Sequence, residues 1–183
     1  GTTVYAGTAA GKIDVETPDA EFYRRYVGGS ALATYYLLRD LEPGVDALSP
    51  ENVLVFAAGV ITGTAVAGSS RYTVAAKSPL TGGFGEAEAG GWWGPEFKMA
   101  GFDAIVFKGR SPKPVYLWIK DGVAELRDAG AIWGLPTAEA QEAIRAELGE
   151  PRARIAQCGP AGEKLIRYAC VINELKHVNG RTG

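Results

Sequence analysis

Apolar residues occur along the chain in short runs of strand length and in a few stretches with helical spacing. The strand-like runs cover residues 3–15 (a weak hairpin that turns near 9–11), 53–58, 72–77, 104–107, 115–120, 123–127, 152–157 and 165–173. The run from Val53 to Ala58 is apolar throughout, which is typical of a strand buried on both faces. Asp121-Gly122 separates two of the runs and predicts a two-residue hairpin.

Helical spacing marks three further stretches. Residues 19–41 have it, with an interruption at Gly28-Gly29-Ser30, so we expect a short helix, a glycine turn and a second helix. Thr137 can cap a helix that ends before Gly149. Residues 95–99 predict a short helix, because its opening proline suits a first helical position.

The stretch 71–101 is the most unusual part of the chain. It begins with Arg71 and combines many glycines with a tryptophan pair and three acids, and residues 81–91 can hardly form a core of their own. Glycines let a ligand approach bare backbone, and a glycine-rich loop before a helix offers N–H groups to an anion. The alternative is a long hairpin loop whose glycines serve only turns. Composition does not separate the two interpretations.

Length and composition limit the classes of protein. A length of 183 residues is typical of one domain. The formal charge of −2 without a basic run argues against a nucleic-acid partner. We find no apolar run of membrane length and no signal-peptide pattern, so we expect no membrane partner. Cys158 and Cys170 are too few and too separated for a metal cluster, and we expect buried thiols of a cytoplasmic protein.

A repeated pattern links two parts of the sequence. VLVFAAGVITGT followed by RYTVAAKS resembles ARIAQCGPAGEK followed by RYACVINE. Both read as a strand, a glycine turn and an Arg-Tyr pair that opens a second strand. The pattern is consistent with a duplicated fold, although a match this short also arises by chance.

Four segments resemble the N-terminal domain of the tungsten-containing aldehyde ferredoxin oxidoreductase family: SSRYTVAAKSPLTG, EAGGWWGPEFKMAGFDAIVFKG, KPVYLWI and the closing HVNGRTG. The likeness runs from about Gly11 to the last residue. It implies an α+β fold of two β-sheets with short helices and an approximate two-fold internal duplication. It also implies one pterin-cofactor-binding domain over residues 1–183, excised or truncated from a longer oxidoreductase.

The resemblance implies a function for the longer protein. Family members carry a tungsten, rarely molybdenum, bis-pterin cofactor (tungstopterin, a bis-molybdopterin) and a [4Fe–4S] cluster. Most oxidise aldehydes to carboxylic acids and pass electrons to ferredoxin, and one branch comprises benzoyl-coenzyme A reductase-type catalytic subunits. The family's cluster cysteines and proton-transfer residues lie beyond Gly183. We therefore expect the pterin as partner, ferredoxin or another acceptor and a homodimer for the full-length enzyme, and no catalytic residue or turnover in this chain.

Site residues follow from the resemblance by motif. Glu88 and Val178 stand where the family offers backbone carbonyls to a magnesium ion that bridges the pterin phosphates. Arginine suits phosphate oxygens, and magnesium binds phosphates with a few hard oxygen ligands. The expected contacts to the pterin and phosphate groups come from Arg71, Gly90, Gly91, His177, Gly180 and Arg181.

Several alternatives stay open. Glu88 replaces an asparagine of the aldehyde enzymes, so its carboxylate either adds charge beside the phosphates or binds the metal itself. His177 replaces an arginine and has a structural alternative. Trp92-Trp93 suits the core better than a pterin cover, and Glu86 and Glu88 would share one strand face. At the level of function, the alternatives are a non-catalytic phosphate- or nucleotide-binding module and a purely structural domain.

Overall fold

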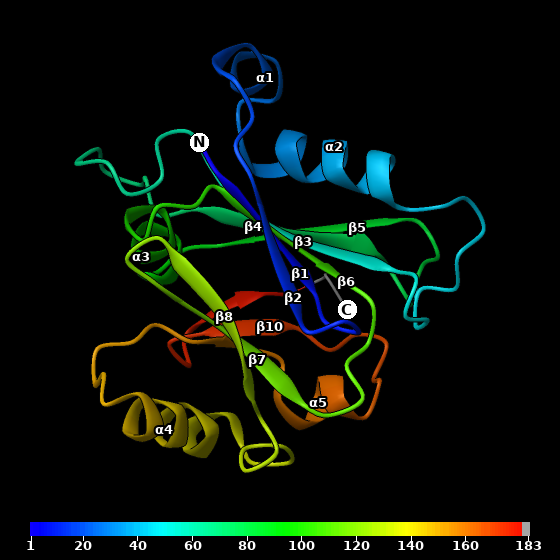
Figure 1. Cartoon of the computed structure of the whole chain (residues 1–183), viewed down its shortest axis with the longest axis vertical. Helices are drawn as coiled ribbons and strands as arrows, with labels where there is room; N and C mark the ends of the chain where they lie inside the picture. Colours follow the sequence, from blue (N-terminus) through cyan, green and yellow to red (C-terminus); the bar gives the residue numbers. More distant parts are fainter. Residues whose placement is uncertain (181–183) are drawn as a thin grey trace.

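A six-stranded sheet crosses the molecule and carries the other elements on its two faces (Figure 1). The computed structural model describes residues 1–180. The strands are β1 (Thr3–Gly7), β2 (Lys12–Glu16), β3 (Val53–Ala58), β4 (Tyr72–Lys77), β5 (Phe84–Ala89), β6 (Ala104–Lys108), β7 (Val115–Lys120), β8 (Val123–Asp128), β9 (Ala156–Gln157), β10 (Val171–Asn173) and β11 (His177–Asn179). The helices are α1 (Ala20–Tyr26), α2 (Gly29–Asp40), α3 (Trp93–Met99), α4 (Thr137–Leu148) and α5 (Gly159–Glu163).

The strand order of this sheet is β2-β1-β6-β3-β4-β5. The β1–β6 pair is parallel, and the other neighbouring pairs are antiparallel. Strand β3 lies between β6 and β4 near the centre, as its continuous apolar run predicts. The predicted hairpins β1–β2 and β7–β8 are both confirmed. Strand β5 is the outer strand at one edge, which becomes important for the site.

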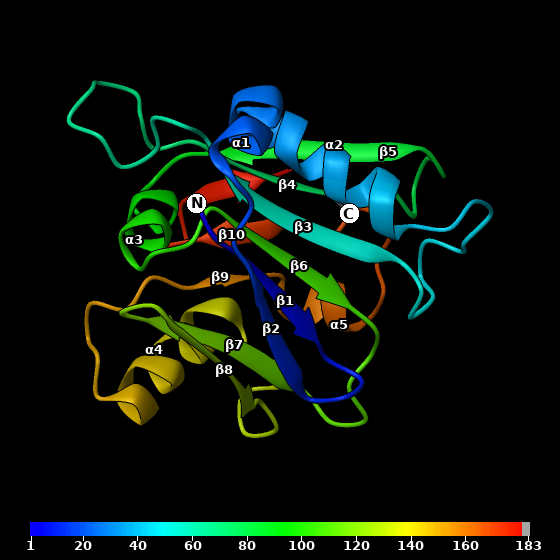
Figure 2. The same ribbon diagram turned by 45° about the horizontal axis from the view of Figure 1, so that its top comes forward.

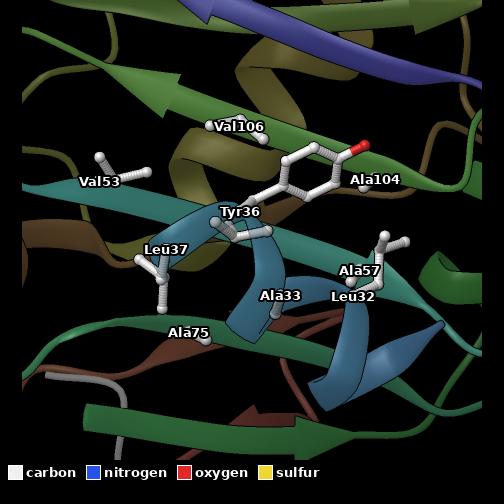
Figure 3. Close-up of a cluster of buried hydrophobic side chains, with 10 residues drawn as sticks. Leu32, Ala33, Tyr36, Leu37, Val53, Ala57, Ala75, Ala104 and Val106 are labelled. Carbon is white, nitrogen blue, oxygen red and sulfur yellow. The ribbon is translucent and has the colours of Figure 1, made fainter. Parts of the chain in front are cut away.

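Helix α2 covers one face of the sheet. The predicted glycine turn is confirmed, since α1 ends before Val27 and α2 begins at Gly29. Leu32, Ala33, Tyr36 and Leu37 are buried against side chains of β3, β4 and β6 (Figure 3). Burying each large apolar side chain contributes about 1.5–3 kcal/mol, so this face holds the helix firmly on the sheet.

The opposite face carries the remaining layers (Figure 2). Val4, Phe56, Tyr72, Val74 and Ile105 of the sheet are buried there together with two phenylalanines of α3 and its following turn. Side chains of the β7–β8 hairpin and of strands β9 and β10 pack against this cluster. The six-stranded sheet is therefore covered on both faces, and its edge at β5 is the part of the sheet that remains as a candidate binding site.

The predicted α+β class with β-sheets and short helices is confirmed. Besides the large sheet, residues 1–180 contain a three-stranded sheet of order β11-β10-β9 and the β7–β8 ribbon. Both halves of the repeated sequence pattern form an antiparallel strand pair, β3–β4 and β9–β10. The two-fold relation between the two halves stays a prediction. Across the described part of the chain, none of the helices has the length and hydropathy to cross a membrane.

Two predicted helix starts are wrong by a few residues. Helix α3 begins at Trp93 rather than Pro95. A proline in the first turn is tolerated because N–H groups there have no partner within the helix. Thr137 is the first residue of α4 and not its cap, because Pro136 occupies the capping position without a side-chain hydrogen bond. Gly149 follows the end of α4, as predicted, and it adopts the left-handed conformation.

The last predicted strands are shorter than expected. Only β9 and β10 form within 152–157 and 165–173, and α5 lies between them. Leu165 has a positive φ of 55°, which interrupts an extended conformation at the start of the second run. The expectation of buried thiols is also wrong, because Cys158 is exposed and Cys170 is half-buried. Cys158 lies in the short connection from β9 to α5 and outside both hydrophobic clusters.

Replacing Tyr36 by Phe tests the α2 face. The change removes a buried hydrogen bond of 2.7 Å between Tyr36 Oη and Thr3 Oγ1, so the free energy of unfolding should fall by about 1–2 kcal/mol. Urea denaturation followed by circular dichroism measures it. Tyr116→Phe is the matched control, because it removes an exposed bond to Glu147 and should cost less than about 0.5 kcal/mol. Equal losses in the two variants would contradict the prediction.

Candidate functional site

The predicted site residues within the described part of the chain lie near one end of the β4–β5 hairpin. Tyr72 pairs with Ala89, so Arg71 and Gly90 lie next to each other at the same end of the two strands. The Arg71 side chain is exposed, and its guanidinium has no hydrogen-bond or ion-pair partner within residues 1–180. A guanidinium that is not paired inside the fold can bind an outside oxyanion with its planar set of donors.

The outer edge of β5 presents backbone groups that the sheet does not use. Ser78 N–H donates to the Gly83 carbonyl over 2.8 Å, which sets the alternation of hydrogen-bonded pairs along this hairpin. By that alternation Gly85, Ala87 and Ala89 face β4, whereas Glu86 and Glu88 direct their backbone N–H and carbonyl groups outward. Since β5 is the last strand of the sheet, the Glu88 carbonyl is a candidate metal ligand.

The side chains of Glu86 and Glu88 share the face of the sheet that carries α2. They pair with Ala75 and Thr73, and Ala75 belongs to the core beneath α2. Ser30 Oγ, in the first turn of α2, donates to Glu86 Oε1 over 2.5 Å. Glu88 is exposed. The prediction that these two carboxylates share a face is confirmed, and one of them is already held by the helix.

Gly91 lies at a tight junction between β5 and the β10–β11 hairpin. Its φ is +89°, and a Cβ there would lie 2.6 Å from His177 Cδ2 and 2.7 Å from Asn173 Oδ1. Asn173 is fully buried, and its Nδ2 donates to Tyr72 Oη over 2.9 Å and to the Gly90 carbonyl over 3.2 Å. Gly91 and His177 are therefore in contact, although they are far apart in the sequence.

A second amide joins β11 to β5. Asn179 is fully buried, and its Nδ2 donates to the Ala87 carbonyl over 3.0 Å. Val178 and Gly180 are exposed on either side of it. The structure thus brings Val178 and Gly180 to the strand that carries Glu88, whereas the predicted contact Arg181 lies outside the described residues.

The start of α3 already binds a carboxylate of the protein. Glu174 Oε2 accepts a hydrogen bond of 2.9 Å from the N–H of Trp92, and Glu174 Oε1 accepts one of 2.7 Å from Arg154. The Trp92 N–H is therefore not free for an outside anion, because the carboxylate that it binds is internal. The glycine-rich stretch forms a hairpin, as the alternative interpretation proposed, but Gly91 does more than allow a turn.

The tryptophan pair divides between core and surface. Trp93 packs against Tyr72 and Phe97, with ring centroids 4.6 Å and 5.1 Å apart, so the core interpretation is right for Trp93. It is wrong for Trp92, which is 60% exposed. Trp92 follows the positive φ of Gly91 and precedes the helix, and this turns its ring outward, where the Arg154 guanidinium lies 5.9 Å from the ring centroid.

Electrostatics separate the buried floor of the site from its rim. Burial raises the pKa of Tyr72 above its usual range, and the hydrogen bond from Asn173 opposes this shift only in part. The buried floor of the site, formed by Tyr72 and Asn173, is therefore neutral. The charged side chains are Arg71, Glu86 and Glu88, which form the rim. Within residues 1–180, no group of three or more His, Cys, Asp or Glu side chains could hold a metal ion. A metal at this edge would need backbone carbonyls and oxygens of a ligand.

Comparisons with known proteins decide the family. Residues 7–183 match the family described as the aldehyde ferredoxin oxidoreductase N-terminal domain. The tungsten-containing aldehyde ferredoxin oxidoreductase of Pyrococcus furiosus is 45% identical over 100% of this chain and 30% of its own length. The enzyme of that name from Thermococcus kodakarensis is 42% identical over 96% and 29%. This chain belongs to the aldehyde ferredoxin oxidoreductase family.

The solved structures agree with that family. The active-site complex BamBC of benzoyl-coenzyme A reductase, in complex with 1,5-dienoyl-CoA, contains a chain that matches with a TM-score of 0.96 and 37% identity. The match covers 100% of this chain and 28% of that one. The chain therefore spans less than a third of the length of these aldehyde ferredoxin oxidoreductase relatives, and the resemblance seen in the sequence motifs is confirmed.

Sequence reasoning missed the residues that build the junction. Asn173, Glu174 and Asn179 carry its hydrogen bonds, but none was a predicted site residue. A signal was present for Asn173, because an amide that follows the apolar Val171 and Ile172 costs free energy unless it is bonded. Its partners could not be identified, since Tyr72 and Gly90 are more than 80 positions away.

Gly91→Ala tests the junction. The added methyl group would meet Asn173, Glu174 and His177 within 2.7 Å at a positive φ, so the free energy of unfolding should fall by about 2–4 kcal/mol. Gly82→Ala is the matched control, because Gly82 also has a positive φ (+72°) but a methyl group added there would have nothing within 4 Å. It should lose only about 1 kcal/mol. Denaturant titration measures both, and similar losses would contradict a packed junction.

Proposed function

We propose that this chain is the tungstopterin-binding N-terminal domain of a longer oxidoreductase. The full-length enzyme would oxidise aldehydes to carboxylic acids and pass electrons to ferredoxin through a [4Fe–4S] cluster held outside this chain. The proposal also treats residues 1–183 as one domain without turnover of its own. The tungsten-containing relatives, which are 42–45% identical over nearly the whole chain, support the cofactor class.

The observation that carries the proposal is the unused backbone edge of β5 with Arg71 at its end. An exposed guanidinium without an internal partner in the described chain fits one pterin phosphate. The outward Glu88 carbonyl and the carbonyl of Val178, an exposed residue of the neighbouring β11, would hold a magnesium ion that neutralises the phosphates. The residues present therefore fit the group.

These contacts indicate different roles for the cofactor and for the residues of this chain. The cofactor would supply the two-electron chemistry. Arg71, Gly90 and the residues at the start of β11 would bind and orient the cofactor's phosphates. The neutral floor at Tyr72 and Asn173 would support the phosphates without adding charge. Arg181, which lies outside the described residues, is proposed as a second phosphate contact. No residue of this chain would transfer a proton.

Arg71→Ala in the full-length enzyme tests the phosphate contact. Loss of a charge-assisted hydrogen-bonding group should weaken cofactor binding by about tenfold or more, so the pterin and tungsten content per polypeptide should fall. Pterin fluorescence after oxidation and metal analysis measure the two. Arg110→Ala, another exposed arginine on the loop after β6, should leave both contents unchanged. Full cofactor content in Arg71→Ala would favour a purely structural role for this domain.

Glu88→Gln separates the backbone from the side chain as the metal ligand. If the outward carbonyl binds magnesium, the change keeps the ligand and removes only a carboxylate on the α2 face. The ratio of magnesium to pterin in the purified full-length enzyme should then stay the same. Elemental analysis measures this ratio, and a loss of about half or more of the magnesium would instead identify the carboxylate as the ligand.

A second candidate function is a benzoyl-coenzyme A reductase-type catalytic subunit. The observation in its favour is the TM-score of 0.96 over the whole chain with the benzoyl-coenzyme A reductase complex. Both candidates would use the same edge of β5 for the cofactor, so this chain's geometry favours neither. They are distinguished by whether the full-length enzyme turns over an aldehyde or benzoyl-coenzyme A.

A further inference from the structure

The order of elements in residues 115–179 repeats the order in residues 3–89. Each half begins with an antiparallel hairpin, β1–β2 or β7–β8, and continues with a helix of 12 residues, α2 or α4. Three strands follow in each half, β3-β4-β5 or β9-β10-β11, and successive strands pair antiparallel. Within these two ranges, only the short helices α1 and α5 lack a counterpart in the other half.

The helix of each half is bonded to the first strand of that half. Tyr36 of α2 and Thr3 of β1 share a hydrogen bond of 2.7 Å. In the second half, Tyr116 Oη of β7 donates to Glu147 Oε1 of α4 over 2.8 Å. The opposite faces of β1, through Val4, and of β7 belong to or pack against one hydrophobic cluster. Strand β7 therefore lies between a helix and this cluster, as β1 does.

One strand of the first half has no counterpart within the described chain. Strand β6 lies between β1 and β3, parallel to the first and antiparallel to the second, and joins them in one sheet. Within residues 1–180, β7 pairs with β8 alone and β9 pairs with β10 alone. Both strands nevertheless pack against the same hydrophobic cluster. Helix α4 contacts both of them, because Gln157 Nε2 of β9 donates to the Thr137 carbonyl over 2.8 Å.

The open edge of β7 presents backbone groups at alternate residues. Asp121-Gly122 has positive φ at both positions, and a two-residue turn of this kind makes the flanking Lys120 and Val123 a hydrogen-bonded pair. By the alternation of an antiparallel ladder, Leu117 and Ile119 direct their N–H and carbonyl groups away from β8. An unpaired edge of this kind is a template for another strand.

We propose that the open edges of β7 and β9 receive one strand of the longer polypeptide, supplied from beyond Gly183. This strand pairs parallel to β7 and antiparallel to β9, as β6 does with β1 and β3. It joins β8-β7 and β9-β10-β11 in a second sheet with the strand order of the first. The proposal rests on the longer chain of the proposed function and not on its cofactor. This chain covers 30% of the length of its Pyrococcus furiosus relative, so a longer polypeptide can supply the strand.

The surroundings specify the sequence of this strand. Residues 104–106 of β6 are at most 3% exposed, because α2 covers one face of β6 and the hydrophobic cluster covers the other. The equivalent place lies between α4 and the same cluster, so we expect a run of about five apolar residues. Strand β5 ends at Ala89 and β6 begins at Ala104, which places the run about 15 residues after Asn179. A gene sequence without such a run in the next 30 or so codons after Gly183 would contradict the proposal.

Hydrogen exchange of the full-length enzyme tests whether the edge of β7 is paired. The Leu117 and Ile119 amides should exchange as slowly as those of Tyr116 and Trp118, which bond to β8, because all four amides would then lie in strand ladders. At an open edge, the two outward amides would exchange on the order of 100-fold faster. Mass spectrometry with electron-transfer fragmentation resolves single amides. Fast exchange of both outward amides in the folded enzyme would overturn the proposal.

Leu117→Pro distinguishes strand pairing from coverage by side chains. Proline removes the outward N–H, so the thermal midpoint of the full-length enzyme should be lower than that of Leu117→Ala by about 3 °C or more. Leu126 is the matched control, because it pairs with Leu117 across the hairpin and directs its backbone groups to the outer edge of β8. Proline and alanine at Leu126 should differ little, since an outer strand tolerates proline. Equal differences at the two positions would mean that β7 is not an inner strand.

The two proposals are tested separately. Fast exchange at Leu117 and Ile119 in an enzyme with full pterin content would overturn the added strand and leave the cofactor site at Arg71 supported. Slow exchange at these amides, together with full pterin content in Arg71→Ala, would support the added strand and contradict the phosphate contact.

Discussion

Two buried asparagine amides join the small sheet to the large one, and the candidate site depends on that joint. Asn173 binds Tyr72 and the Gly90 carbonyl, and Asn179 binds the Ala87 carbonyl. Because side chains make the connection, β11 lies beside β5 without a backbone ladder between them in the sheet pairing. The outward backbone groups of Glu86 and Glu88 are thereby left for a ligand. A further strand paired to β5 would have used these backbone groups in its own hydrogen bonds.

The same joint determines where charge lies. It places Glu174 against the Trp92 N–H and Arg154, which gives this N–H before α3 a partner within the protein. The neutral floor formed by Tyr72 and Asn173 then leaves Arg71 as the cation of the β5 edge, with Glu88 on the α2 face beside it. An oxyanion and a metal ion can be held together in such a place, because the arginine and the metal neutralise charges that the carboxylate alone would repel.

Local chemistry made several features predictable from the sequence. The apolar run of β3, the Asp121-Gly122 turn and the glycine break before α2 each depend on neighbours within a few positions, and all were predicted. Helix starts were predicted less well, since Pro95 and Thr137 are compatible with more than one position of a first turn. Among the site residues, the motifs indicated Arg71, Glu88 and Gly91, but their roles came from the resemblance rather than from local physics.

The sequence by itself therefore determined the α+β class, the order of most elements and the family, because these follow from local propensity and from motifs in a characteristic order. Only the tertiary structure decided that β5 is an edge with an outward Glu88 carbonyl, that Glu174 binds the Trp92 N–H before α3, and that Asn173 and Asn179 join the small sheet to the large one. The physical reason is distance along the chain. Asn173 and Gly90 are separated by 83 positions, and no local pattern specifies which buried amide meets which carbonyl.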